Sequence, residues 1–200
     1  MCWIIYYSAT HYLDRVVPPI SITLFAMAGI LAYLFVSGFI WGAGYFPTSS
    51  KEIDNVIKLM DLKEGSTFFD LGSGFGRMIV SVANKSNMNC VGIEIDPLKC
   101  AWTNLMIRSK GLSSRVKVIR QNLLSADISN ADGIFVFLSN ETSIMERLQK
   151  KIEREASPDI RIVSYIHRFK NWAPEAREGD LYLYTMKKVA GDGKADATKS

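Results

Sequence analysis

The sequence predicts an α/β protein with a mainly parallel sheet, preceded by one membrane-spanning helix. Its 200 residues are 48% hydrophobic and 22% charged, which is a globular composition rather than a disordered or collagen-like one. An uncharged apolar segment lies near the N-terminus. Further on, short apolar runs alternate with amphipathic segments of about 10–15 residues, a pattern typical of βαβ units.

The N-terminal apolar segment is long enough to cross a bilayer. No charged residue occurs between Val16 and Lys51, and Ile20–Trp41 consists almost entirely of apolar side chains. A helix of about 20 such residues spans the hydrocarbon core, whereas a cleaved signal peptide has an apolar core of only about 7–15. Trp41 and Tyr45 stand where an interfacial aromatic belt would lie. We therefore expect a single membrane span.

The charges beside this segment predict its orientation. Asp14 and Arg15 precede it and Lys51 and Lys58 follow it, a slight positive-inside bias. We expect the C-terminal part to face the cytoplasm, or the matrix in an organelle. The expected organisation is an N-terminal segment over residues 1–15, the transmembrane helix and its flank over 16–44, a folded domain over 45–188 and a disordered tail over 189–200.

Composition argues against several classes of function. The three cysteines form no CxxC pair, and the two histidines are far apart, so neither a disulfide-stapled fold nor a structural zinc site is expected. A formal net charge of +4 is mild and does not establish a nucleic-acid surface. We therefore expect no metal and no nucleic-acid partner.

The first elements of the domain follow from local signals. Ser49 and Glu52 have capping-box spacing, and apolar residues follow at helical intervals, which predicts a helix over Ser50–Met60. Ser66–Leu71 is a short apolar run entering a glycine cluster, typical of a buried parallel strand. Gly76–Asn84 then has a helical pattern.

The alternation continues to the C-terminus. The later helices are expected over Pro97–Lys110, which stops at Gly111, and over Glu141–Glu155, which is broken by Pro158. The last strand follows a short connection without a clear helix and could pair antiparallel at an edge. The later strands are expected over Cys90–Ile95, Val116–Arg120, Gly133–Leu138, Ile160–Ile166 and Leu181–Met186.

The glycine cluster Asp70–Arg77 (DLGSGFGR) predicts a ligand-binding turn. Three glycines at alternate positions let the backbone pass close to a ligand where a Cβ would collide. A dinucleotide fingerprint would read GxGxxG, but Arg77 stands in place of its last glycine. Asp70 at the mouth would repel pyrophosphate and attract a ligand that carries an ammonium and a sulfonium.

A second acid follows the next expected strand. Glu94 lies about 20 residues beyond the glycine cluster, the separation at which a carboxylate can bond to ribose hydroxyls. Either piece alone is a weak signal. Together, at the ends of two successive strands, they favour a nucleoside-type ligand over a glycine turn beside unrelated surface acids.

At these residues the sequence resembles the class I, S-adenosylmethionine-dependent methyltransferases. The resemblance implies a Rossmann-like fold with a seven-strand-type sheet and S-adenosyl-L-methionine as cofactor. The short segment between Trp172 and Leu181 leaves open whether one edge strand is missing. Carried over by motif, the cofactor-binding residues would be Tyr45, Pro47, Thr48, Asp70, Gly72, Ser73, Gly74, Phe75, Gly76, Glu94, Ile95, Asn122, Leu123 and Leu138.

A narrower resemblance is to a group of protein-lysine methyltransferases, both small archaeal enzymes and membrane-anchored mitochondrial ones. The pieces similar to it are Tyr45–Thr48, Phe137–Asn140, Leu148–Glu155 and Arg161–Trp172. This resemblance implies a membrane-anchored lysine methyltransferase acting on a membrane-associated protein. Phe75 departs from the group, which commonly has aspartate there and so a polar contact that this chain lacks.

A lysine acceptor must lose a proton before it reacts, because its unperturbed pKa is about 10.4. An apolar channel beside a cationic cofactor would favour the neutral amine, so no dedicated histidine base is required. The candidate residues of that catalytic channel are Tyr45, Ser139, Asn140 and Trp172.

Two other functions stay open at this point. A methyltransferase for a lipid, quinone or other small hydrophobic acceptor would suit a membrane anchor equally well. A catalytically inactive cofactor-binding membrane module is the other alternative, and Phe75 is the feature that keeps it open.

Overall fold

The computed structural model describes residues 20–33, 49–138 and 142–186, which fall in two compact units, Met1–Ala43 and Gly44–Ser200. In the first unit, residues 20–33 form a helix with mostly exposed side chains. No helix within the described ranges is both long and apolar enough to cross a membrane. The rest of the expected span, like residues 1–15 and the tail over 189–200, lies outside the described residues.

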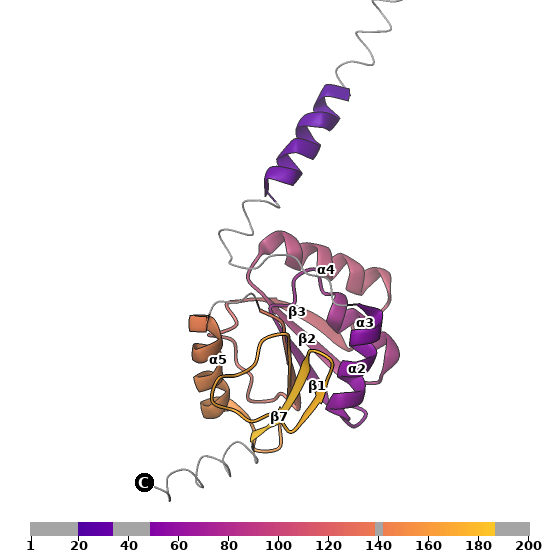
Figure 1. Ribbon diagram of the computed structural model, residues 1–200. Coiled ribbons are helices and arrows are strands. Elements are labelled where there is room, and N and C mark those ends of the chain that lie inside the picture. The colour runs from indigo at the N-terminus through magenta and orange to yellow at the C-terminus, as the bar shows by residue number, and fades with distance from the viewer. Residues whose placement is uncertain (1–19, 34–48, 139–141, 187–200) are drawn as a thin grey trace, which may run out of the picture. The chain divides into compact units, whose positions relative to one another are not determined.

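The second unit is built on one seven-stranded sheet with the order β3-β2-β1-β4-β5-β7-β6 (Figure 1). Strands β1 to β5 are parallel to their neighbours, and the order reverses between β1 and β4. Ligands of open α/β sheets bind at such a reversal, beyond the carboxyl ends of the strands. The strands are β1 Thr67–Leu71, β2 Asn89–Glu94, β3 Val116–Arg120, β4 Gly133–Val136, β5 Arg161–Tyr165, β6 Ala176–Glu178 and β7 Leu181–Thr185.

The C-terminal strands complete the sheet and correct one expectation. The edge strand left open by the sequence is present as β6, which has only three residues and pairs antiparallel with β7. Strand β7 is antiparallel to β5, as expected, but lies between β5 and β6 rather than at the edge. A two-residue turn, in which Gly179 has φ +59°, joins the pair. Strand β6 is too short to display an alternating pattern.

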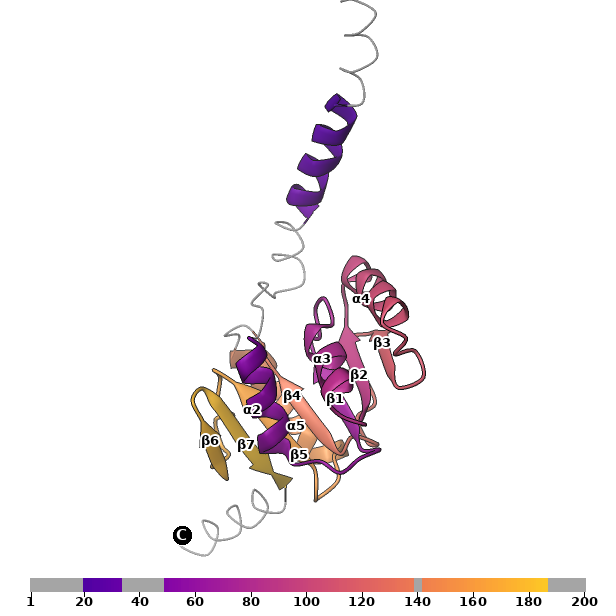
Figure 2. The ribbon, with the colours of Figure 1, turned by 90° about the vertical axis from the view of Figure 1, so that its right-hand side faces the viewer.

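Three helices cover one face of the sheet, and α5 covers the other (Figure 2). The helices are α2 Ser50–Met60, α3 Arg77–Lys85, α4 Pro97–Ser109 and α5 Thr142–Glu155. The predicted capping box is present, since the Ser49 hydroxyl accepts from the Glu52 amide and the Glu52 carboxylate accepts from the Ser49 amide. Because α2 leads into β1 and α4 follows β2, both helices begin at the carboxyl edge of the parallel strands.

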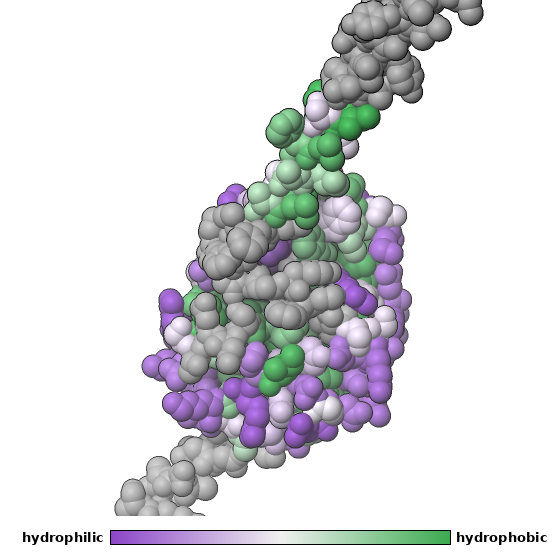
Figure 3. Space-filling model, turned by 45° about the horizontal axis from the view of Figure 1, so that its top comes forward, coloured by the Kyte–Doolittle hydropathy of each residue, from purple (hydrophilic) through white to green (hydrophobic). Residues whose placement is uncertain are grey.

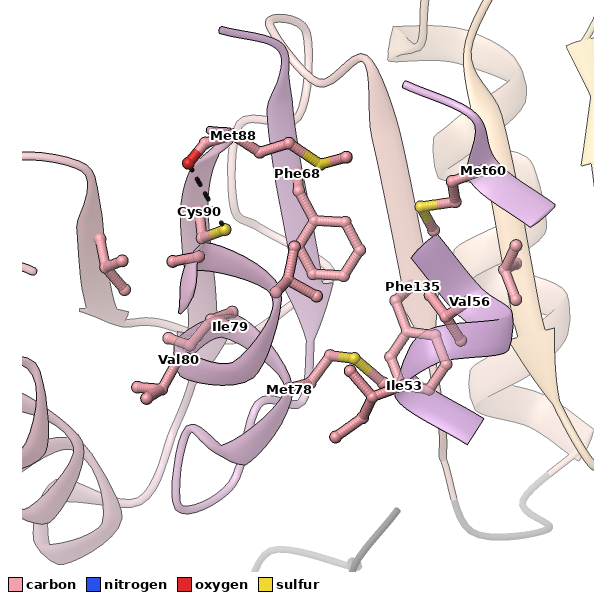
Figure 4. Close-up of a cluster of buried hydrophobic side chains, with 14 of the residues drawn as sticks. Ile53, Val56, Met60, Phe68, Met78, Ile79, Val80, Met88, Cys90 and Phe135 are labelled. Atoms are coloured by element: carbon pink, nitrogen blue, oxygen red, sulfur yellow. Dashed lines mark hydrogen bonds between the residues drawn. The ribbon is translucent and has the colours of Figure 1, made fainter. Parts of the chain in front are cut away.

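Each face of the sheet buries its own apolar cluster. The cluster under α2 and α3 includes Ile53, Phe68 and Ile79, each about 1% exposed or less (Figure 4). The cluster under α5 contains Leu148 and Ile152, both fully buried. These two layers hold β1 and β4 at the centre of the domain, so the strand ends that form the site below are fixed from both sides.

A candidate cofactor site at the carboxyl edge of the sheet

The glycine turn after β1 is tied to the neighbouring strand. The amides of Gly72 and Ser73 both donate to the Ile93 carbonyl of β2, at 2.9 and 3.0 Å. Gly72 has φ +91°, a conformation that side chains with a Cβ rarely adopt. The turn is therefore held against β2, in the place that the sequence predicted for it.

Two later glycines of the turn serve different purposes. At Gly76, which has φ +74°, an added Cβ would lie 2.3 Å from Cγ2 of Thr103, so this glycine permits close packing between α3 and α4. At Gly74, which has φ +54°, an added Cβ would meet no atom within 4 Å. The open side of Gly74 thus leaves bare backbone beside free space, as a bound nucleoside would require.

Asp70 is a buried acid at the end of β1. Its side chain is only 4% exposed, and no donor among the described residues hydrogen-bonds to its carboxylate. Burial, and secondarily the nearby Glu94 carboxylate, raise the pKa of Asp70 to about 8. A cationic ligand at this point would favour the ionised carboxylate, so the site fits the charged methionine end of S-adenosylmethionine.

Glu94, the last residue of β2, is held by backbone amides. Oε2 accepts from the Gly74 amide at 2.7 Å, and Oε1 accepts from the amides of Ile95 and Asp96, both at 2.9 Å. A carboxylate offers about four acceptor positions, so these three bonds leave room for a ligand hydroxyl. The Gly74 bond also fixes the carboxylate directly beside the glycine turn.

Leu138 and Phe75 flank the turn. An added Cβ on Gly72 would lie 3.1 Å from Cδ2 of Leu138, so the structure brings these two predicted residues together although they follow different strands, β1 and β4. Phe75 packs edge-to-face against Trp102 of α4, with ring centroids 6.5 Å apart. Phe75 therefore belongs to the contact between the turn and α4.

The remaining predicted cofactor residues follow β2 and β3. Asn122 is exposed, and its Oδ1 accepts from the Leu124 amide at 2.9 Å, which shapes the loop after β3. Leu123 is partly buried against the cluster under α5. The Gln121 amide donates to the Glu94 carbonyl at 2.9 Å, so this loop starts beside the end of β2.

The candidate acceptor channel is only partly described. Tyr45, Pro47, Thr48, Ser139 and Asn140 lie outside the described residues.

Trp172 is described, and the structure places it elsewhere. It is 4% exposed, packs against Phe169 and Tyr184, and donates from Nε1 to Glu153 at 2.9 Å. Glu153 is in the last turn of α5, toward the amino edge of the parallel strands. Trp172 is thus a packing residue that the structure does not bring to Asp70 and Glu94; its similarity to the lysine group reflected a large apolar side chain, which the core also demands.

Sequence reasoning missed two residues that support the turn. Thr103 is fully buried on α4, and its Oγ1 donates to the Gly74 carbonyl at 3.3 Å. Gly92, inside β2, makes room for Ser73, whose Oγ would lie 2.6 Å from an added Cβ. A glycine inside an apolar strand is a signal of close approach and could have revealed Gly92. Nothing around Thr103 in the sequence marks it.

The described residues contain no group of histidine, cysteine, aspartate or glutamate side chains able to hold a metal ion.

Comparison with known proteins agrees with this site. The family model of the ANTKMT methyltransferase domain matches residues 70–176, which begin at Asp70 and include Glu94. A protein-lysine N-methyltransferase of Saccharolobus islandicus is 30% identical over 71% of this chain and 92% of that protein. A human lysine N-methyltransferase named for a component of ATP synthase is 28% identical over 77% of this chain and 66% of that protein.

A solved structure supports the same fold and cofactor. An RNA methyltransferase of Salinibacter ruber, in complex with S-adenosyl-L-homocysteine, has a TM-score of 0.66 and 30% identity, covering 70% of this chain and 94% of that one. S-adenosylhomocysteine is what S-adenosylmethionine becomes after giving up its methyl group. On these grounds the chain belongs to the family of the ANTKMT methyltransferase domain and is an S-adenosylmethionine-dependent methyltransferase.

Proposed function

We propose that the protein is a membrane-anchored protein-lysine N-methyltransferase that acts on a membrane-associated protein. The observation that carries the cofactor half of the proposal is the pair Asp70 and Glu94, which lie on adjacent strands at either side of the open backbone of Gly74. The relatives named as lysine methyltransferases support the lysine acceptor.

In the proposed site, Asp70 binds the ammonium of the methionine end and Glu94 accepts from a ribose hydroxyl. When bound, S-adenosylmethionine supplies a sulfonium methyl that is already activated for transfer. The protein therefore has mainly to align the acceptor, a contribution that can reach about 7–11 kcal/mol of the barrier. Leu138 forms an apolar wall against Gly72. Such a wall favours the neutral form of an entering amine.

The membrane half of the proposal rests on the N-terminal segment. The chain is free of charge between Val16 and Lys51. In the described helix over residues 20–33, the large apolar side chains stand exposed, Phe25 at 79% and Ile22 at 68% among them. Such a surface is unfavourable in water, and a bilayer would cover it. We propose a single-pass anchor with the catalytic domain on the cytoplasmic or matrix side.

The acceptor can be tested directly. The full chain, in nanodiscs, is incubated with membranes and total RNA from cells lacking the protein, together with radiolabelled S-adenosylmethionine. We expect label in protein, and mass spectrometry should locate it on lysine. An Asp70→Asn variant serves as the control for enzyme-dependent label. Label only in the lipid extract or only in RNA would overturn the lysine proposal; the RNA fraction is included because the Salinibacter relative is an RNA methyltransferase.

A further inference from the structure

The folded unit exposes few large apolar side chains, and they gather on one helix. Among the described residues after 48, four such side chains are exposed, and three of them are on α4: Leu98 at 55%, Trp102 at 51% and Leu105 at 62%. Their spacings of four and three residues put them on one face of the helix. We call these three residues the α4 stripe. Figure 3 shows that hydrophilic side chains cover the lower part of the visible domain surface.

The orientation of the stripe is fixed. The opposite side of α4 is buried, with Thr103 fully enclosed and Ile107 3% exposed. Thr103 also donates to the Gly74 carbonyl, and Trp102 contacts Phe75 of the same turn. Helix α4 therefore cannot roll to hide the stripe without dismantling the glycine turn.

The surroundings of the stripe are strongly basic. The 30 residues of Pro97–Ala126 contain no aspartate or glutamate and six lysines and arginines, whereas the whole chain has a net charge of only +4. Helix α4 packs against β3, which lies at the edge of the sheet. Four of the six basic side chains are exposed on these two elements and the turn between them: Arg108, Lys110, Lys117 and Arg120.

Apolar side chains beside basic ones are the combination that binds an anionic bilayer. Tryptophan is enriched at membrane interfaces, and each basic residue near an anionic surface contributes about 1 kcal/mol. Two leucines offer nothing for a nucleic-acid base to stack on, which favours lipid over RNA as the occupant.

The chain also limits how far this surface can be from the proposed anchor. Nine residues lead from Trp41 to Ser50, the start of α2. Fully extended, they reach about 30 Å. Because α2 and α4 both begin at the carboxyl edge of the sheet, a short tether keeps that edge, and with it the stripe, near the bilayer.

We propose that the α4 stripe docks in the headgroup region of an anionic bilayer and presents the mouth of the cofactor site to lysines at the membrane surface. This inference rests on the proposed anchor and deepens the proposed function. The docked state puts Leu98, Trp102 and Leu105 among acyl chains and leaves the basic residues among the phosphates.

The test measures depth in the membrane. The full chain carries Cys2→Ser, since Cys90 and Cys100 are buried. A nitroxide is attached through Leu105→Cys or, as the matched control, Asn104→Cys, which is exposed on α4 but about 100° away from Leu105. In nanodiscs of phosphatidylcholine with phosphatidylglycerol, we expect the label at 105 to be accessible to oxygen and shielded from a polar nickel complex. The label at 104 should remain accessible to nickel.

Equal nickel accessibility at both positions would overturn the proposal. So would shielding of position 105 from both reagents, which would indicate coverage by protein, or shielding that appears only when RNA is added. Loss of the difference in nanodiscs of phosphatidylcholine alone would support the role of anionic lipid.

A functional readout separates this proposal from the previous one. Leu105→Glu should slow methylation of acceptors in membranes about tenfold relative to Asn104→Glu, and both variants should methylate a soluble lysine peptide equally. If the wild type methylates no lysine while position 105 is still buried in lipid, the acceptor proposal fails and the docking proposal stands. If Leu105→Glu methylates membranes as well as Asn104→Glu does, the docking proposal fails.

Discussion

Replacing Asp70 by asparagine should stabilise the protein without cofactor at neutral pH. The pKa of Asp70 is raised from 3.8 to about 8, chiefly by burial. Between these two values the folded state holds a proton that the unfolded state releases. The wild type is therefore most stable, relative to the variant, at pH below about 4 and loses that advantage as pH rises towards 8. The side-chain amide of the variant has no proton to lose in this range.

The magnitude follows from the width of the window. Each pH unit inside it changes the free energy of unfolding by about 1.36 kcal/mol. Between pH 5 and pH 7 the wild type should thus lose up to about 2.7 kcal/mol relative to the variant, or about 5–10 °C in Tm for a chain of this size.

The assay is thermal unfolding of the full-length wild type and Asp70→Asn at pH 5, 6 and 7, without cofactor. Taking the difference between the two proteins at each pH removes the contribution of every other titrating group that they share. Parallel pH profiles for the two proteins would refute the claim that Asp70 is protonated in the folded state.

The cofactor should reverse the effect. A cation bound at Asp70 favours the ionised carboxylate, so binding at pH 7 should release close to one proton, and affinity should rise with pH up to about 8. Calorimetry in buffers of different ionisation enthalpy measures the released proton. In Asp70→Asn, affinity should fall at least tenfold at pH 8, and the proton release should disappear. Proton release that persists in the variant would assign the titration to another group.

Three further substitutions test the site and its supports. Gly76→Ala should lower stability by at least about 2 kcal/mol, because its Cβ would lie 2.3 Å from Thr103, whereas Gly111→Ala, with φ +66° but open space around it, should cost about 1 kcal/mol; denaturant unfolding compares them, and equal losses would contradict the packing argument. Glu94→Gln should weaken cofactor binding about tenfold in calorimetry, since it retains the shape but loses the charge that holds the Gly74 amide; unchanged affinity would count against a cofactor role. Trp172→Phe should lower Tm while leaving kcat within about twofold, and a large loss of kcat in a folded variant would restore Trp172 to the acceptor channel.

The elements that the sequence predicted well are those with strong local signals. The capping box fixed the start of α2 within one residue, and Gly111 marked the end of α4 closely. The glycine turn and Glu94 came together because carboxyl ends of adjacent parallel strands meet by geometry alone. Strand β6 escaped because its three residues form only half a hairpin, and their pairing with β7 is a tertiary fact.

Side-chain partners were harder to predict than elements. The sequence placed Glu94 at the strand end but could not show that three backbone amides already hold its carboxylate. Trp172 was assigned by resemblance to a channel, whereas its neighbours Phe169 and Tyr184 come from segments whose packing no short motif encodes. Exposure of the α4 stripe was equally hidden, because α4 is apolar on its buried side as well.

The features that a stable fold would avoid occur at the same edge of the sheet. Asp70 is a carboxylate buried beside another carboxylate, and Gly74 adopts a left-handed conformation beside empty space. The exposed Trp102 begins one contact away, at Phe75. Each feature disfavours the protein alone, and each is relieved by a different partner: a cation relieves Asp70, a nucleoside fills the space beside Gly74, and lipid covers Trp102. Because the three lie on one connected turn and helix, binding of the cofactor and docking on a membrane should act on the same structural unit.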